Sequence, residues 1–176
     1  PKKYRDAYRF VAEKLREYGA DNVAFVWHVV SSKTANQDFM AYYPGDDVVD
    51  WFAISIFSKN IFELPLTEEI YQESVKRGKP FMIAESTAKQ GKAGIAGCKE
   101  PGKVDWDWFE KYFEFIRTHS NVKMFSYIGG GHIEDFVDGE TAVDCNSEIL
   151  EKWLEELEDS RYVHSSPGLY SSLGYV

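Results

Sequence analysis

The sequence has little of what marks disulfide scaffolds, zinc domains, nucleic-acid binders and membrane proteins. It contains 2 cysteines, Cys98 and Cys145, in 176 residues. Two cysteines are too few for a disulfide scaffold, and we expect two thiols, with a single bridge as the alternative if the protein is secreted. No Cys/His grouping has the spacing of a structural zinc site, and we expect no metal and no cofactor.

Positive charge is also scarce. The 20 Lys and Arg are outnumbered by 29 Asp and Glu, which gives a net charge of −9. No basic patch interrupts this acidic balance, so we expect no binding to nucleic acid or to an anionic membrane. No apolar run approaches the ~20 residues that a membrane-spanning helix needs.

Aromatic residues, in contrast, are abundant. The chain has 5 Trp, 11 Tyr and 12 Phe, more than packing usually requires. Rings at loop positions are platforms on which sugars stack, although rings inside a core have the same appearance in a sequence. The length predicts one domain over residues 1–176 with a sizeable core.

Helix and strand patterns alternate along the chain, beginning with a helix. Steps of three and four residues between apolar side chains predict helices, and short apolar runs predict strands. We expect Gly19 to close the first helix, Thr67 to cap the second and Asp105 to cap the third. The predicted helices are 4–18, 67–76, 105–116 and 147–158, and the predicted strands are 22–30, 48–57, 81–85 and 122–128.

This order predicts an α/β fold with parallel strands. Four such units form either a small open sheet or half of an eight-stranded barrel, which normally needs about 250 residues. The third strand is apolar throughout and ends on Glu85. A carboxylate delivered to the carboxyl edge of a sheet is either a catalytic group or a strand-end residue paired with Lys or Arg.

Several segments resemble clan A glycoside hydrolases, especially the family 26 β-mannanases. The sequence Tyr-Tyr-Pro-Gly-Asp-Asp-Val-Val-Asp-Trp at 42–51 resembles a family segment, and 79–86 resembles the seventh barrel strand, which ends on the nucleophilic Glu. The fifth barrel strand of the family resembles residues 25–28, and the eighth resembles residues 122–127. The tail that follows the family's last helix resembles residues 161–164. The resemblance implies the carboxyl-terminal half of a (β/α)8 barrel, with strands five to eight.

The resemblance also implies a function. Glu85 would be the nucleophile of a retaining hydrolase that acts within a β-1,4-linked polysaccharide, such as mannan or a related hemicellulose or glucan. The family's acid/base Glu ends the fourth strand, which would precede Pro1. We therefore expect this chain to be inactive alone, to require the missing amino-terminal half-barrel or a second copy, and to come from a secreted protein.

Four further residues are candidates for contact with a polysaccharide or oligosaccharide substrate: Trp27, Tyr127, Asp46 and His132. Each has a structural alternative: core packing for Trp27, an ordinary rim position for Tyr127, a turn after Pro-Gly for Asp46, and a substrate-free loop for His132. Alternation along a strand places His28 on the face opposite Trp27, where a structural histidine is the simpler interpretation.

A second hypothesis belongs to a different functional class. A half-barrel that pairs with its own copy would bury its open sheet edges and bind glycan without cleaving it. The mass of the particle and its binding of oligosaccharides distinguish this pseudo-enzyme from half of a hydrolase.

Overall fold

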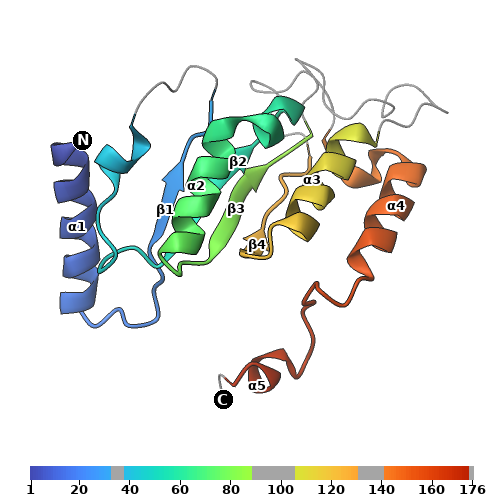
Figure 1. Cartoon of the computed structure of the whole chain (residues 1–176). Helices are drawn as coiled ribbons and strands as arrows, with labels where there is room; N and C mark the ends of the chain where they lie inside the picture. The colour runs from blue at the N-terminus through green and yellow to red at the C-terminus, as the bar shows by residue number, and fades with distance from the viewer. Residues whose placement is uncertain (33–37, 89–105, 131–140, 175–176) are drawn as a thin grey trace.

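The computed structural model describes residues 1–32, 38–88, 106–130 and 141–174, and it contains one sheet of four parallel strands (Figure 1). Each strand lies beside the strand that precedes it in sequence, in the order β1-β2-β3-β4. This order is that of a barrel wall, and it confirms the predicted parallel (β/α) units. The strands are β1 (Val26–Val29), β2 (Trp51–Ile56), β3 (Phe81–Ser86) and β4 (Val122–Phe125).

Helices connect and flank the strands. They are α1 (Lys2–Glu17), α2 (Pro65–Lys76), α3 (Asp107–Thr118), α4 (Ser147–Leu157) and the short α5 (Leu169–Ser172). Within the described ranges, 3-10 turns lie at Phe39–Tyr42, Lys59–Glu63 and Val143–Cys145. Helices α2 and α3 lie over the same face of the sheet (Figure 1), and no helix in the described ranges is both long and apolar enough to cross a membrane.

The ends of the helices agree only partly with the sequence analysis. Gly19 has φ +79° just after α1, which confirms it as the residue that closes this helix. Helix α2, however, begins at Pro65, because proline fits the first turn, where its missing N–H leaves no bond unmade. The prediction that Thr67 caps α2 is therefore wrong: its buried hydroxyl donates to the Ile61 carbonyl at 2.6 Å. Asp105 lies outside the described residues.

The core lies between the sheet and α2 and α3. Alternate strand residues point toward these helices, and Phe52, Ile54, Phe81 and Ile83 are each 0% exposed. Helix α3 contributes a row of buried rings, Trp108, Phe109, Tyr112 and Phe113. This face of the sheet is therefore the wall against which the chain folds, and the other face is free to present polar groups.

Trp27 belongs to this core. Its ring is 2% exposed and lies 4.8 Å from the Tyr43 ring and 5.2 Å from the Phe52 ring, both edge to face. Contacts of this kind between buried aromatic rings add to the free energy gained by burial.

The position of Trp27 predicts a large loss of stability on truncation. Trp27→Ala should lower the free energy of unfolding by about 3–5 kcal/mol, because it leaves a cavity among rings. The matched change at the next residue, His28→Ala, removes an exposed side chain with one hydrogen bond, and should cost about 1 kcal/mol. Urea unfolding of both variants measures the difference, and equal losses would contradict the assignment of the two faces.

Candidate active site

A β-bulge determines the direction of Glu85. Strand β3 pairs Ile83 with Ile54 of β2, but the next pair is Glu85 with Ser55, so Ala84 is an extra residue. Without that extra residue, Glu85 would share the helix-facing side of Phe81 and Ile83, because strand side chains alternate. The bulge reverses the alternation, and Glu85 points to the open face of the sheet instead.

The residue after the glutamate shows the same reversal. Ser86 is 0% exposed, and its hydroxyl donates to the hydroxyl of Tyr112 on α3 at 2.9 Å. Ser86 therefore faces the helices, and Glu85, its neighbour on the exposed side of the strand, faces away from them. The carboxylate stands near the carboxyl end of β3, where barrel enzymes carry their catalytic groups.

Three side chains from three adjacent strands form one chain of hydrogen bonds on the open face. The Ser55 hydroxyl on β2 donates to Oε2 of Glu85 at 3.0 Å. The same hydroxyl lies 2.7 Å from Nε2 of His28 on β1. Sequence reasoning did not select Ser55 as a site residue, and it treated His28 as structural. The alternation of His28 with Trp27 was the available signal, but which face was open required the packed helices.

Trp27 does not join these residues. It lies on the opposite face of β1, buried under the 3-10 turn that holds Phe39 and beside Tyr43. The expectation that its ring stacks on a sugar is not supported by this position, because no sugar reaches a side chain that is 2% exposed.

Tyr127 holds two distant segments of the chain together. Its hydroxyl donates to the Thr141 carbonyl at 2.7 Å, and its ring packs against Phe109 and Trp153, with centroids at 5.7 and 5.2 Å. The hydroxyl thus ties the segment after β4 to the segment before α4. These contacts give Tyr127 a packing role, and its contact with substrate stays a prediction.

Asp46 lies at the wrong edge of the sheet for the predicted substrate contact. It precedes β2, and its partner Arg77 precedes β3, so both stand at the amino ends of the strands, opposite Glu85. Asp46 accepts from the Tyr43 hydroxyl at 2.7 Å and from Arg77 at 3.0 Å. These bonds, that to Tyr43 first, hold the pKa of Asp46 below its usual range. The interpretation of Asp46 as a turn residue fits this network.

The glycine of this turn is required by its backbone conformation. Gly45 has φ +123°, and a Cβ there would lie 2.8 Å from Oδ1 of Asp47 and 3.1 Å from Nη1 of Arg9. These two atoms belong to the Arg9–Asp47 ion pair, which joins α1 to the turn at 2.7 Å. The contacts observed for the Pro-Gly-Asp-Asp motif are therefore structural ones.

Two other predictions concern His132 and the cysteines. His132 lies outside the described residues. Cys145 is disulfide-bonded, so the prediction of two thiols is wrong for this residue. A covalent bond of this kind restricts the unfolded chain and stabilises the fold. Within the described ranges, no three or more His, Cys, Asp or Glu side chains are grouped as metal ligands.

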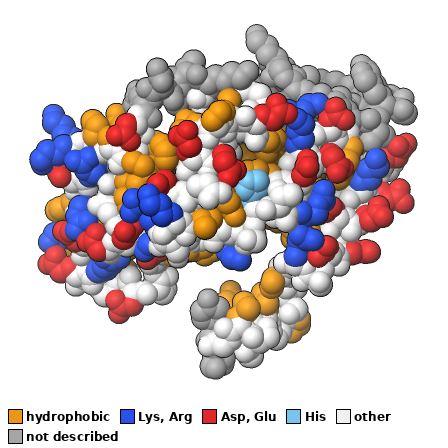
Figure 2. Space-filling view, in the orientation of Figure 1, with side chains coloured by type: hydrophobic (Ala, Val, Ile, Leu, Met, Phe, Trp, Pro, Cys, Tyr) orange, Lys and Arg blue, Asp and Glu red, His pale blue; other side chains and the backbone are white. Residues whose placement is uncertain are grey.

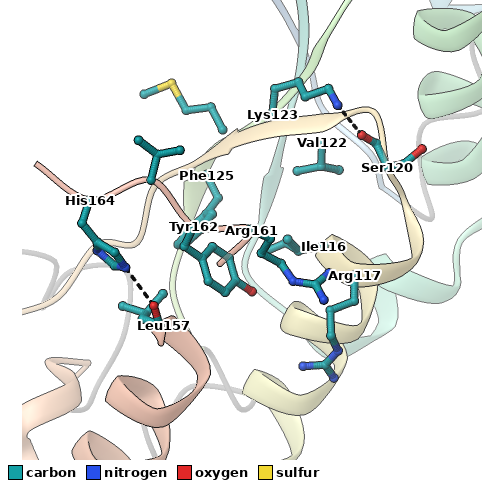
Figure 3. A pocket seen from close by; sticks show the side chains of 12 residues that line it. Ile116, Arg117, Ser120, Val122, Lys123, Phe125, Leu157, Arg161, Tyr162 and His164 are labelled. Atoms are coloured by element: carbon teal, nitrogen blue, oxygen red, sulfur yellow. Dashed lines mark hydrogen bonds between the residues drawn. The ribbon is translucent and has the colours of Figure 1, made fainter. Parts of the chain in front are cut away.

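Two hollows lie along the outer edges of the sheet and away from Glu85. One of about 650 Å³ lies between α3, β4 and residues 157–164, where Tyr162 and Arg161 face Phe125 and Val122 (Figure 3). The other, of about 550 Å³, lies between α1 and the segment that leads into β1. Both have mainly apolar walls, with Met124 51% exposed at the first and Val11 52% exposed at the second.

The face of the molecule shown in Figure 2 carries charges of both signs. Lys and Arg side chains are interspersed with Asp and Glu over this face (Figure 2). A surface of mixed sign with a net charge of −9 is suited to a neutral ligand rather than a polyanion.

Comparison with known proteins connects this geometry to one family. The model of glycosyl hydrolase family 26 matches residues 1–134. A beta-1,3-xylanase of Vibrio sp is 29% identical over 97% of the chain, and a beta-1,3-xylanase of Alcaligenes sp is 27% identical over 98%. The chain spans only 42% of each of these relatives.

Solved structures agree on the fold. The catalytic domain of a Bacillus sp. JAMB-750 GH26 endo-beta-1,4-mannanase superposes with a TM-score of 0.63 at 19% identity, over 92% of this chain and 45% of that one. A Cellulomonas fimi endo-beta-1,4-mannanase double mutant gives 0.61 at 18% identity, over 90% and 36%. The four strands thus correspond to part of a larger (β/α)8 barrel.

The Asp46 network predicts acid sensitivity. A carboxyl whose pKa is lowered by folding stabilises the folded state above its unfolded pKa, near 3.8, and loses that contribution as the pH falls through the lower folded value. Asp46→Asn should lower the free energy of unfolding at pH 6 by less than about 1 kcal/mol, because Asp46 is 58% exposed and solvent screens the pair.

The difference between wild type and Asp46→Asn should shrink as the pH is lowered from 6 to 2.5, measured by urea unfolding at each pH. Asp21→Asn, at an exposed aspartate that has no ion pair within the described part, is the control and should give no such trend. A difference that grows on acidification would contradict the network.

Proposed function

Because this chain belongs to glycosyl hydrolase family 26, we propose that it is the carboxyl-terminal half of a retaining β-glycan hydrolase, with Glu85 as its nucleophile. The observation that carries this proposal is the bulge at Ala84. It turns a carboxylate away from the core and onto the open face of the sheet, near the carboxyl end of β3. The structural alternative, a strand-end residue paired with Lys or Arg, is not favoured, because Glu85 has no such partner in the described part of the chain.

The proposed chemistry needs two carboxyl groups. A lone pair of Glu85 forms the bond to the anomeric carbon, and the glycosidic C–O bond breaks with its electron pair on the leaving oxygen. That oxygen takes a proton from a carboxylic acid, which later removes a proton from water as the glycosyl-enzyme is hydrolysed. The two groups stand about 5–5.5 Å apart in retaining enzymes. We propose that the acid comes from the other half of the barrel.

The outer edges of the sheet support a second half. Strands β1 and β4 each have one neighbouring strand in the described part of the chain, and an apolar hollow runs along each of these edges. Two apolar seams, one at each end of a four-stranded wall, match what an amino-terminal half-barrel would cover. The occupant we propose is therefore the remaining part of the same barrel.

For the substrate we propose β-1,3-linked xylan ahead of β-1,4-linked mannan. The curated relatives that match 97–98% of this chain at 27–29% identity are both named beta-1,3-xylanases, whereas the mannanase structures are 18–19% identical. The β-1,4 linkage implied by the sequence resemblance is the alternative. Secretion is part of the proposal, since polysaccharides of this class lie outside the cell, and the disulfide at Cys145 fits an oxidising compartment.

The pairing of two copies remains the second candidate. The same apolar edges favour it, because a chain with two open seams can bury them against itself. Sedimentation of the isolated chain separates the two: a stable dimer that binds oligosaccharides favours a glycan-binding half-barrel. A one-to-one particle with a relative's amino-terminal half favours the hydrolase.

The decisive change is Glu85→Gln in a completed barrel, by which we mean this chain joined to the amino-terminal half-barrel of a family 26 relative. We expect this variant to lose at least about 10³-fold in kcat on β-1,3-xylan, because the amide cannot form the glycosyl-enzyme. Reducing-sugar release on xylan and mannan measures both the loss and the substrate.

Glu69→Gln, at an exposed position on α2, is the matched control and should leave turnover unchanged. Full turnover by Glu85→Gln would remove Glu85 from the mechanism. Binding of xylan without hydrolysis by an otherwise folded completed barrel would favour the glycan-binding candidate.

A further inference from the structure

Ser55 on β2 contacts Glu85, and His28 on β1 contacts Ser55. Neither residue has a part in the chemistry proposed above. We propose that Ser55 and His28 are positioning residues that hold one oxygen of Glu85, Oε2, and leave the other, Oε1, as the atom that attacks. This inference rests on the proposed role of Glu85 and adds to it the identity of the attacking oxygen.

The direction of each hydrogen bond follows from counting protons. An ionised carboxylate only accepts, so the 3.0 Å contact uses the single hydroxyl proton of Ser55. That hydroxyl has no second proton to give, so in its 2.7 Å contact with His28 it must accept. Nε2 of His28 therefore carries a hydrogen, which fixes the tautomer of the neutral ring. The chain of donors runs from His28 through Ser55 to Glu85.

The arrangement leaves the two carboxylate oxygens unequal. Ser55 is bonded to Oε2, while Oε1 has no partner among the described residues. A hydrogen-bonded oxygen is a weaker nucleophile than a free one, and the bond also fixes the rotation of the carboxylate plane. Oε1 is thereby aimed along one direction, as a reaction between two positioned groups requires.

The support beneath this contact is rigid. Ser55 lies on β2, which is hydrogen-bonded to a strand on each side, and its side chain is only 8% exposed. Its pairing with Glu85 exists because of the extra residue Ala84, since an unbroken register would place Ala84 opposite Ser55. The same bulge therefore turns the carboxylate outward and brings it to its donor.

The first test is turnover in the completed barrel. Ser55→Ala should lower kcat on β-1,3-xylan about 10- to 100-fold, with KM changed by less than about threefold, because substrate binding does not involve this hydroxyl. Ser55→Thr keeps the hydroxyl and should recover most of the loss. Urea unfolding of each variant identifies one that fails merely because it is unstable.

The second test is a spectroscopic signature that does not depend on activity. With 15N-labelled histidine in the chain, neutral His28 should be found almost wholly as the Nε2-protonated tautomer, and Ser55→Ala should lower this fraction to the mixture of tautomers that a solvent-exposed histidine shows. His28→Gln identifies the signal by its disappearance. Thr118, beside His119, offers a control, since Thr118→Ala should leave the His28 signal unchanged.

The outcomes are distinguishable. A His28 ring protonated at Nδ1 in the wild type, or a Ser55→Ala variant with unchanged kcat, would overturn the positioning role while leaving Glu85 as nucleophile. Full turnover by Glu85→Gln would overturn the proposed function, and with it any catalytic meaning of the contact, whatever tautomer is found. Loss of kcat in Ser55→Ala, its recovery in Ser55→Thr and the Nε2 tautomer together support the inference.

Discussion

One extra residue in one strand decides what this sheet presents to solvent. The alternation of β3 would otherwise place Glu85 beside Phe81 and Ile83, under the helices, where an unpaired carboxylate is costly to bury. The bulge at Ala84 reverses this alternation, keeps Ser86 bonded to α3 and brings the carboxylate to the hydroxyl of Ser55. Strand pairing, core packing and the candidate site thus share a single constraint.

The two faces of the sheet have different roles: the helix-covered face holds the core, and the open face holds the candidate site. The rings packed against α2 and α3 stabilise the sheet, and the polar chain from His28 to Glu85 lies on the face opposite these two helices. The turn with Gly45 and Asp46, at the amino edge, ties α1 and α2 to the sheet through ion pairs. The two edges of the sheet differ in the same way as in barrel enzymes, where residues at the amino edge stabilise the fold and residues at the carboxyl edge carry the catalytic groups.

Much of the fold could be predicted from the sequence, because helix and strand periodicities are local. The site was predictable only in part. Alternation separates Trp27 from His28, but which of the two faces the core depends on helices distant in sequence. The outward direction of Glu85 depends on the bulge at Ala84, and an alanine within an apolar run gives no sequence signal of a bulge. The position of Asp46 was a missed signal, since a residue that precedes a strand stands at its amino edge.

The most direct test of the account is to trap the glycosyl-enzyme. A 2-fluoro xyloside with a dinitrophenolate leaving group needs no acid for the first step, and its fluorine slows the hydrolysis that would release it. After the completed barrel is treated with this compound, mass spectrometry of the peptides should find the fluorosugar as an ester on Glu85. A label on any other carboxylate, or none on a barrel that hydrolyses xylan, would contradict the account.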